Sequence, residues 1–167
     1  GYDSGDKTPL AALAYVSFQE LATRVSHRNT GRASGCPIAD QLLARIAADE
    51  NLHMVFYRDI LGAALKVQPS AAVRAIVDEV LAFEMPGAGI KGFRRKAAQM
   101  AMAGIYDLRI HRDEVVLPLV RKLRLFELQG LSPEAEQACT ELSDFLDEMD
   151  ASAKRLEERR ARVRADA

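Results

Sequence analysis

The sequence predicts an all-α protein that forms one domain over residues 1–167. Leucine and alanine are abundant, aromatic residues make up only 6%, and tryptophan is absent, a composition that favours helices over sheets. Long segments repeat apolar residues every three or four positions, and no useful segment alternates apolar and polar residues as a strand does. With 49% hydrophobic and 28% charged residues, the chain can bury a core and keep a polar surface.

The helix boundaries follow from proline, glycine and capping residues. Residues 1–7 are polar and predict a loop, after which Thr8 and Pro9 are suited to the N-cap and first position of a helix. The glycines and proline of residues 31–37 predict a loop, and Pro118 predicts a bend inside a later helix. We expect six helices, over residues 9–29, 37–66, 68–85, 90–106, 107–128 and 133–167.

Charge and cysteine content exclude several classes of protein. Lysine and arginine number 23 and aspartate and glutamate 24, a balance that argues against bulk electrostatic binding to nucleic acid or anionic membranes. Cys36 and Cys139 are far apart and form no CxxC pattern, so neither a disulfide scaffold nor a cysteine-based zinc site is expected. No apolar run approaches the roughly 20 residues of a membrane-spanning helix, and no signal peptide is visible, so we expect a cytoplasmic protein.

Acidic residues interrupt the expected apolar faces of the first two long helices. In the second helix one face carries Leu43, Ile46, Glu50, His53, Met54, Tyr57 and Leu61. In the first helix one face carries Leu13, Val16, Ser17, Glu20, Thr23 and His27. A buried carboxylate is costly unless it is paired or binds a metal.

Glu50 and His53 form a Glu-x-x-His unit, which supplies ligands to di-iron helical bundles. A lone unit of this kind also occurs as a solvated pair or beside a core histidine. Glu20 on a neighbouring helix favours the metal site, which we predict from Glu20, Glu50 and His53.

These segments resemble a known family. Residues 15–30, YVSFQELATRVSHRNT, resemble the third metal-bearing helix of the soluble acyl-ACP desaturases, where ACP is the acyl carrier protein. Residues 46–53, IAADENLH, resemble the fourth metal-bearing helix. The similarity extends over essentially the whole chain and is greatest to mycobacterial members, which are similar to plant stearoyl-ACP desaturases. It implies a ferritin-like di-iron helical bundle, here partial because the N-terminal helices are lacking.

The resemblance also implies roles for individual residues. Glu20 is similar to the chelating carboxylate, Glu50 to the bridging carboxylate and His53 to the terminal imidazole ligand of the di-iron centre. Asp49 would orient a ligating histidine, and Thr23 would lie beside the oxygen-binding site. The implied reaction inserts a cis double bond into an ACP-bound fatty acyl chain, using O2, two iron ions and two electrons from ferredoxin, in a homodimeric enzyme.

The sequence supplies only half of such a ligand set. A complete site takes a glutamate from each of two helices and a Glu-x-x-His from each of two more. Arg24 and Leu108 stand three residues before the other histidines, so neither forms a second unit, and we expect His27 and His111 to be surface or capping residues. A truncated chain is the interpretation we favour. A two-fold dimer of half sites and a degenerate, non-catalytic bundle with an incomplete site remain as alternatives.

Two basic clusters complete the candidate features. The C-terminal run over residues 154–164 is typical of a solvated helix face with internal ion pairs. Lys91, Arg94, Arg95 and Lys96 form either a solvent face or a landing site for acidic acyl carrier protein.

Overall fold

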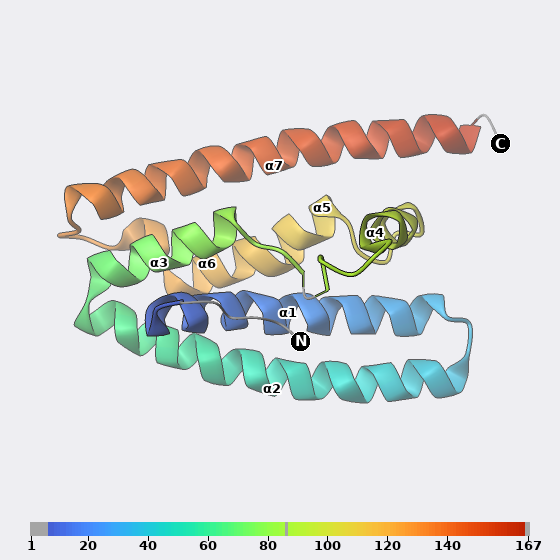
Figure 1. The fold of residues 1–167 in the computed structure, drawn as a ribbon, viewed down its shortest axis with the longest axis horizontal. Coiled ribbons are helices and arrows are strands. Elements are labelled where there is room, and N and C mark those ends of the chain that lie inside the picture. Colours follow the sequence, from blue (N-terminus) through green and yellow to red (C-terminus); the bar gives the residue numbers. More distant parts are fainter. Residues whose placement is uncertain (1–6, 86, 166–167) are drawn as a thin grey trace.

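The protein is a layered bundle of helices in the computed structural model, which describes residues 7–85 and 87–165 (Figure 1). The described residues form no strand, so the predicted all-α class is confirmed. Helix α2 lies on one side, α1 packs along it, α3 and α6 lie further in, and α7 runs along the opposite side (Figure 1). The elements are α1 Pro9–Ala33, α2 Pro37–Val67, α3 Pro69–Leu81, α4 Phe93–Met102, α5 Leu108–Ile110, the π-helix η1 His111–Val116, α6 Leu117–Leu123, the 3-10 helix η2 Leu125–Glu127, and α7 Pro133–Ala165.

Helix α1 begins where predicted and ends later than predicted. The side chain of Thr8 accepts a hydrogen bond from the backbone N–H of Ala11 at 3.2 Å, which confirms the N-cap. The predicted stop near Gly31 is wrong, because the helix continues through this residue to Ala33. Gly31 is buried, and a Cβ atom there would lie 2.9 Å from Oδ1 of Asp40. The glycine therefore allows α1 and α2 to approach each other closely instead of ending the helix.

The predicted helix over residues 107–128 is divided into four short elements. Pro118 has no N–H to donate and its ring crowds the preceding turn, so the helix cannot continue regularly through it. The chain responds with the π-helix η1 directly before α6, and Arg124 then takes a left-handed conformation with φ of 55°. Similarly, α3 ends at Leu81 and α4 covers residues 93–102, both shorter than predicted. The break expected between the helices over residues 68–85 and 90–106 is confirmed, since residues 83–85 and 87–90 are not helical, and Pro86 itself lies outside the described residues.

The hydrophobic core lies between α1, α2, α3, η1, α6 and α7. Its fully buried large side chains include Phe18, Leu61, Ile76, Val115, Leu119 and Leu142. None of the helices in the described part combines the length and the apolar character needed to cross a membrane.

Helix α2 is apolar on more than one face. It contributes Ala47, Met54, Leu61 and Leu65 to the buried residues. Its outer side exposes a set of large apolar side chains, namely Ile38, Leu42, Leu52, Phe56, Ile60 and Val67. A helix that is apolar on opposite faces is typical of one that packs against protein on both sides.

His111 lies between aromatic side chains at the start of the π-helix, so the predicted surface or capping role is wrong. Its ring stacks on Phe83 with ring centroids 4.8 Å apart, and its Nδ1 lies 2.8 Å from the hydroxyl oxygen of Tyr106. Burial lowers the pKa of His111 to about 4. The imidazole is therefore neutral at physiological pH.

This shift predicts a pH dependence of stability. In the unfolded chain the pKa of histidine is about 6.5, so between that value and the folded pKa the unfolded state binds more protons. The contribution of His111 is complete above about pH 6.5 and falls by up to about 3 kcal/mol as the pH approaches 4. Urea unfolding of the wild type and of His111→Gln should show that the wild type loses this much more free energy of unfolding over that range. An equal pH dependence in both proteins would contradict the assignment.

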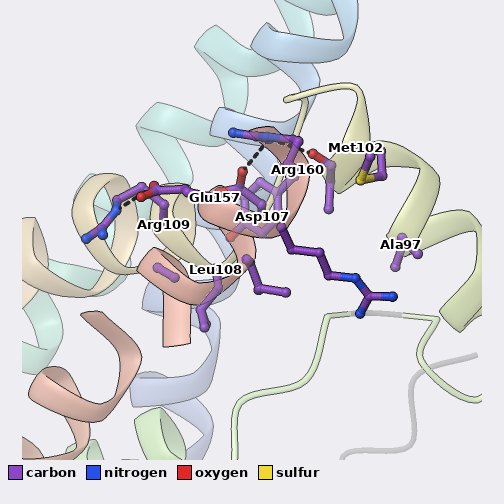
Figure 2. A pocket seen from close by; sticks show the side chains of 13 residues that line it. Ala97, Met102, Asp107, Leu108, Arg109, Glu157 and Arg160 are labelled. Carbon is purple, nitrogen blue, oxygen red and sulfur yellow. Dashed lines mark hydrogen bonds and ion pairs between the residues drawn. The ribbon is translucent and has the colours of Figure 1, made fainter. Parts of the chain in front are cut away.

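A cavity of about 680 Å³ lies between α4, α5 and α7 (Figure 2). Arg160 of α7 connects these elements, since its guanidinium donates to the carboxylate of Asp107 at 3.2 Å and to the backbone oxygen of Ala101 at 2.9 Å. Arg109 is similarly bonded to Asp150 and Glu157 of α7. These ion pairs hold α5 and the end of α4 against α7.

Candidate metal centre

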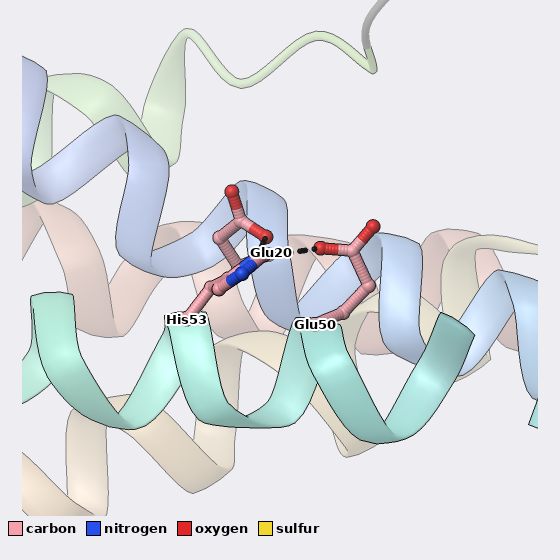
Figure 3. A group of neighbouring side chains, drawn as sticks. All are labelled: Glu20, Glu50 and His53. Atoms are coloured by element: carbon pink, nitrogen blue, oxygen red, sulfur yellow. Dashed lines mark hydrogen bonds and ion pairs between the residues drawn. The ribbon is translucent and has the colours of Figure 1, made fainter. Parts of the chain in front are cut away.

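Helices α1 and α2 bring the three predicted ligands together (Figure 3). One donor atom each from Glu20, Glu50 and His53 lies within 4.8 Å of the others. Nδ1 of His53 is 3.3 Å from Oε2 of Glu50 and 3.4 Å from Oε2 of Glu20. The expected convergence on one point is confirmed, whereas metal binding by these residues stays a prediction.

The local sequence explains why the side chains meet. Glu50 and His53 are three residues apart in α2, so they lie on one face of that helix. In α1, Phe18, Leu21 and Ala22 are buried in the core and fix the rotation of the helix about its axis. Glu20 is thereby directed towards α2 at the level of Glu50 and His53 (Figure 3).

The three side chains differ in exposure. The side chain of Glu20 is 14% exposed and that of Glu50 is 20% exposed, so the prediction that these acids are withdrawn from solvent is confirmed. The side chain of His53 is 57% exposed, and the prediction that it lies in the interior is wrong for the described chain. The imidazole stands on the open side of the helix pair, beside the exposed apolar face of α2.

The electrostatics of the cluster favour a bound cation. Oε2 of Glu20 is buried and accepts no hydrogen bond from the described residues, although Nδ1 of His53 lies within ion-pair distance. Burial, together with the hydrogen bond and negative charge of Glu50, raises the pKa of Glu20 to about 7. For His53, desolvation lowers the pKa, but the hydrogen bond with Glu50 and the charge of Glu20 outweigh it, so the net shift is upward. A cation would neutralise the two carboxylates and bind the orphaned oxygen.

The donor set and its spacing fit a first-row transition metal. Nitrogen and oxygen ligands bind such ions at about 2.0–2.2 Å, which places neighbouring donors roughly 3 Å apart. The observed separations of 3.3 and 3.4 Å are close to this value. Carboxylate and imidazole are also the ligand types of carboxylate-bridged di-iron bundles, in which glutamates outnumber histidines.

The structure places the two predicted supporting residues beside the cluster without joining them to it. The hydroxyl of Thr23 donates to the backbone oxygens of Gln19 and Glu20 at 3.1 and 3.0 Å, which attaches it to the turn that carries Glu20. Asp49 is exposed, and the partner that the structure assigns to it is Arg45 at 3.9 Å rather than His53. The predicted roles of both residues stay predictions.

One contact of the cluster was not predicted. Nε2 of His27, expected at the surface or in a cap, lies 3.9 Å from Oε1 of Glu50. His27 is seven residues after Glu20, two helical turns along the same face of α1, and this spacing is the signal that could have indicated the contact.

Comparison with known proteins agrees with this arrangement. A family model described as fatty acid desaturase matches residues 2–167. DesA1 of Mycobacterium tuberculosis, which carries the name of an acyl-ACP desaturase, is 47% identical over 146 residues, covering 87% of this chain and 43% of DesA1. The chloroplastic stearoyl-ACP 9-desaturase of Gossypium hirsutum is 31% identical over 164 residues, covering 92% of this chain and 40% of the plant protein.

A solved structure supports the same relationship. The X-ray structure of DesA2 from Mycobacterium tuberculosis H37Rv, titled as an acyl-ACP desaturase, matches with a TM-score of 0.65 and 26% identity, over 80% of this chain and 53% of DesA2. This chain spans less than half the length of the named sequence relatives. The all-α ferritin-like bundle is confirmed, and the chain belongs to the fatty acid desaturase family, in which its named relatives are acyl-ACP desaturases.

Proposed function

We propose that this chain contributes half of the di-iron centre of an acyl-ACP desaturase, which inserts a cis double bond into an ACP-bound fatty acyl chain. One observation carries the proposal. In a chain of the fatty acid desaturase family, one donor atom each from Glu20, Glu50 and His53 lies within 4.8 Å of the others. In this proposal the three residues are iron ligands.

The chemistry of the substrate explains why a metal is needed. An alkyl methylene has no acidic proton and no leaving group, so side-chain acids and bases have nothing to act on. Two bound iron ions, with O2 and two external electrons, supply the oxidising power that removes two hydrogens. The role of this chain is to hold the ions with Glu20, Glu50 and His53 and to balance their charge. Because bound carboxylates are deprotonated, Glu20 releases its proton when the metal binds.

The remaining ligands belong, in this proposal, to protein outside the 167 residues. A complete centre needs a second glutamate and a second Glu-x-x-His unit. The exposed apolar side chains Leu52, Phe56 and Ile60 stand beside His53 on α2, where further helices would cover them. The chain spans less than half the length of the named relatives, and this supports the same interpretation. The ferredoxin donor, the homodimer and the cytoplasmic location are also part of the proposal and rest on the resemblance.

The reaction itself provides the test. An iron-loaded protein that contains these residues and the rest of the ligand set is mixed with stearoyl-ACP, reduced ferredoxin and O2. Mass spectrometry of the released acyl chains should show a product two hydrogens lighter, with the double bond in the cis configuration. An iron-loaded protein that makes no such product would favour the alternative of a non-catalytic bundle.

A further inference from the structure

Helix α4 belongs to a strongly basic segment of the sequence. It lies at the far end of the molecule from the turn between α2 and α3 (Figure 1). Residues 85–106 contain four cations, Lys91, Arg94, Arg95 and Lys96, and no acidic residue, although the whole chain has a net charge of -1. All four side chains are exposed. Within residues 7–85 and 87–165, the structure records no ion pair for any of them.

This lack of partners distinguishes the α4 cations from the arginines that stabilise the fold. Arg74 pairs with Asp78 and Glu141, and Arg109 pairs with Asp150 and Glu157. No residue of α4 is buried, so its cations are not needed to neutralise acids of the core. Their charge is available to a partner.

Two of the four basic residues adjoin the cavity described above. Ala97, Ala98 and Met102 of α4 line the cavity (Figure 2). Arg94 precedes Ala97 and Ala98 by three and four residues, and Arg95 precedes Ala98 by three, so both arginines lie one turn before the lining residues on the same side of α4.

The opposite wall of the cavity also carries a cation, and the lining carboxylates Asp107 and Glu157 are paired with Arg160 and Arg109. Arg159 of α7 lines the cavity, is exposed, and forms no recorded ion pair with the described residues. Met102 and Leu156 add exposed apolar surface to the cavity walls. The result is an apolar depression with cations along its edge. This arrangement is typical of a surface that binds a partner of opposite charge.

We infer that the α4 cations and the adjoining cavity form the docking surface for acidic acyl carrier protein. The inference rests on the proposed function, which supplies an acidic protein partner that must bind and leave repeatedly. Charge complementarity speeds such encounters and determines which partner binds, while the apolar depression adds contact area. The charge balance of the whole chain, which is net -1, disfavours nucleic acid as the partner.

The test measures binding rather than desaturation. The 167-residue chain is titrated into stearoyl-ACP labelled on the carrier protein, and binding is followed by fluorescence anisotropy of the label. The variant Arg94→Glu/Arg95→Glu should bind at least about tenfold more weakly than the wild type, because two attractive contacts become repulsive. Raising the salt from about 0.05 to about 0.5 M should weaken the wild type more than the variant.

A matched control separates location from total charge. Arg121 and Lys122 of α6 are neighbouring exposed cations without an ion pair among the described residues, and Arg121→Glu/Lys122→Glu changes the net charge by the same amount. This control should bind stearoyl-ACP within about twofold of the wild type. Circular dichroism should show that all three proteins fold.

The outcomes are distinguishable. The docking surface is overturned if the α4 variant Arg94→Glu/Arg95→Glu binds as tightly as the wild type. It is also overturned if the α6 control weakens binding as much as the α4 variant does. Both results leave the proposed function intact. Absence of wild-type binding to stearoyl-ACP overturns the docking surface, whereas the proposed function is overturned separately, by the absence of desaturated product from the protein with the complete ligand set. Binding to phosphatidylglycerol vesicles through the α4 cations, without binding to the carrier protein, would identify a membrane surface as the partner and overturn the inference.

Discussion

Replacing Glu50 or His53 with alanine is expected to reduce desaturation by the complete, iron-loaded enzyme more than about 100-fold. Each substitution removes a proposed iron ligand and leaves the other donors unable to hold the metal in place. Neither side chain belongs to the buried hydrophobic core, so circular dichroism should show nearly unchanged helix content. The measurement is the rate of cis-unsaturated product formation from stearoyl-ACP, together with the iron content of each protein.

Asp59→Ala is the matched control for these substitutions. Asp59 is an acidic residue of the same helix, is exposed, and pairs with Arg58 away from the cluster. Its removal should change the rate by less than about twofold, as expected for an exposed ion pair. Full activity in Glu50→Ala or His53→Ala would contradict their role as ligands.

Replacing Phe18 with alanine is expected to lower the free energy of unfolding by about 3–5 kcal/mol. Phe18 is 1% exposed and packs in the core beneath α1, so its removal leaves a cavity that the surrounding helices fill only partly. Phe18 also lies two residues before Glu20, and its loss should loosen the rotation of α1 that directs Glu20 to the cluster. Urea unfolding monitored by circular dichroism measures the change.

Phe126→Ala removes the same atoms from a surface position. The side chain of Phe126 is 51% exposed, so the expected loss is less than about 1 kcal/mol. A similar decrease in the free energy of unfolding in Phe18→Ala and Phe126→Ala would show that the core is not centred where the structure places it.

Sequence periodicity predicts the long helices well because their signals are local. Thr8, Pro37 and Pro133 mark the starts of α1, α2 and α7, and each is found at or next to the start of its helix. The break before α6 depends on how the chain adapts to Pro118, and sequence alone does not distinguish a simple bend from a π-helix. The prediction that α1 ends near Gly31 is wrong because this glycine serves a contact between α1 and α2, which the local sequence does not reveal.

The site was predictable to the extent that helical spacing determines it. Glu50 and His53 share a face of α2 by their spacing, and Glu20 interrupts the apolar pattern of α1. The exposure of His53 was not predictable, because α2 is apolar on two faces and the sequence does not say which face the described helices cover. The enclosure of His111 by Phe83 and Tyr106 likewise depends on contacts between distant segments.

Anaerobic titration with iron(II) tests most directly whether Glu20, Glu50 and His53 form one metal site. Isothermal calorimetry should detect a saturable site in the wild-type chain, with release of protons as the metal binds. Glu20→Gln keeps the size of the side chain and removes its charge, and it should weaken binding at least about tenfold. Equal iron(II) affinity in the wild type and in Glu20→Gln would contradict the site.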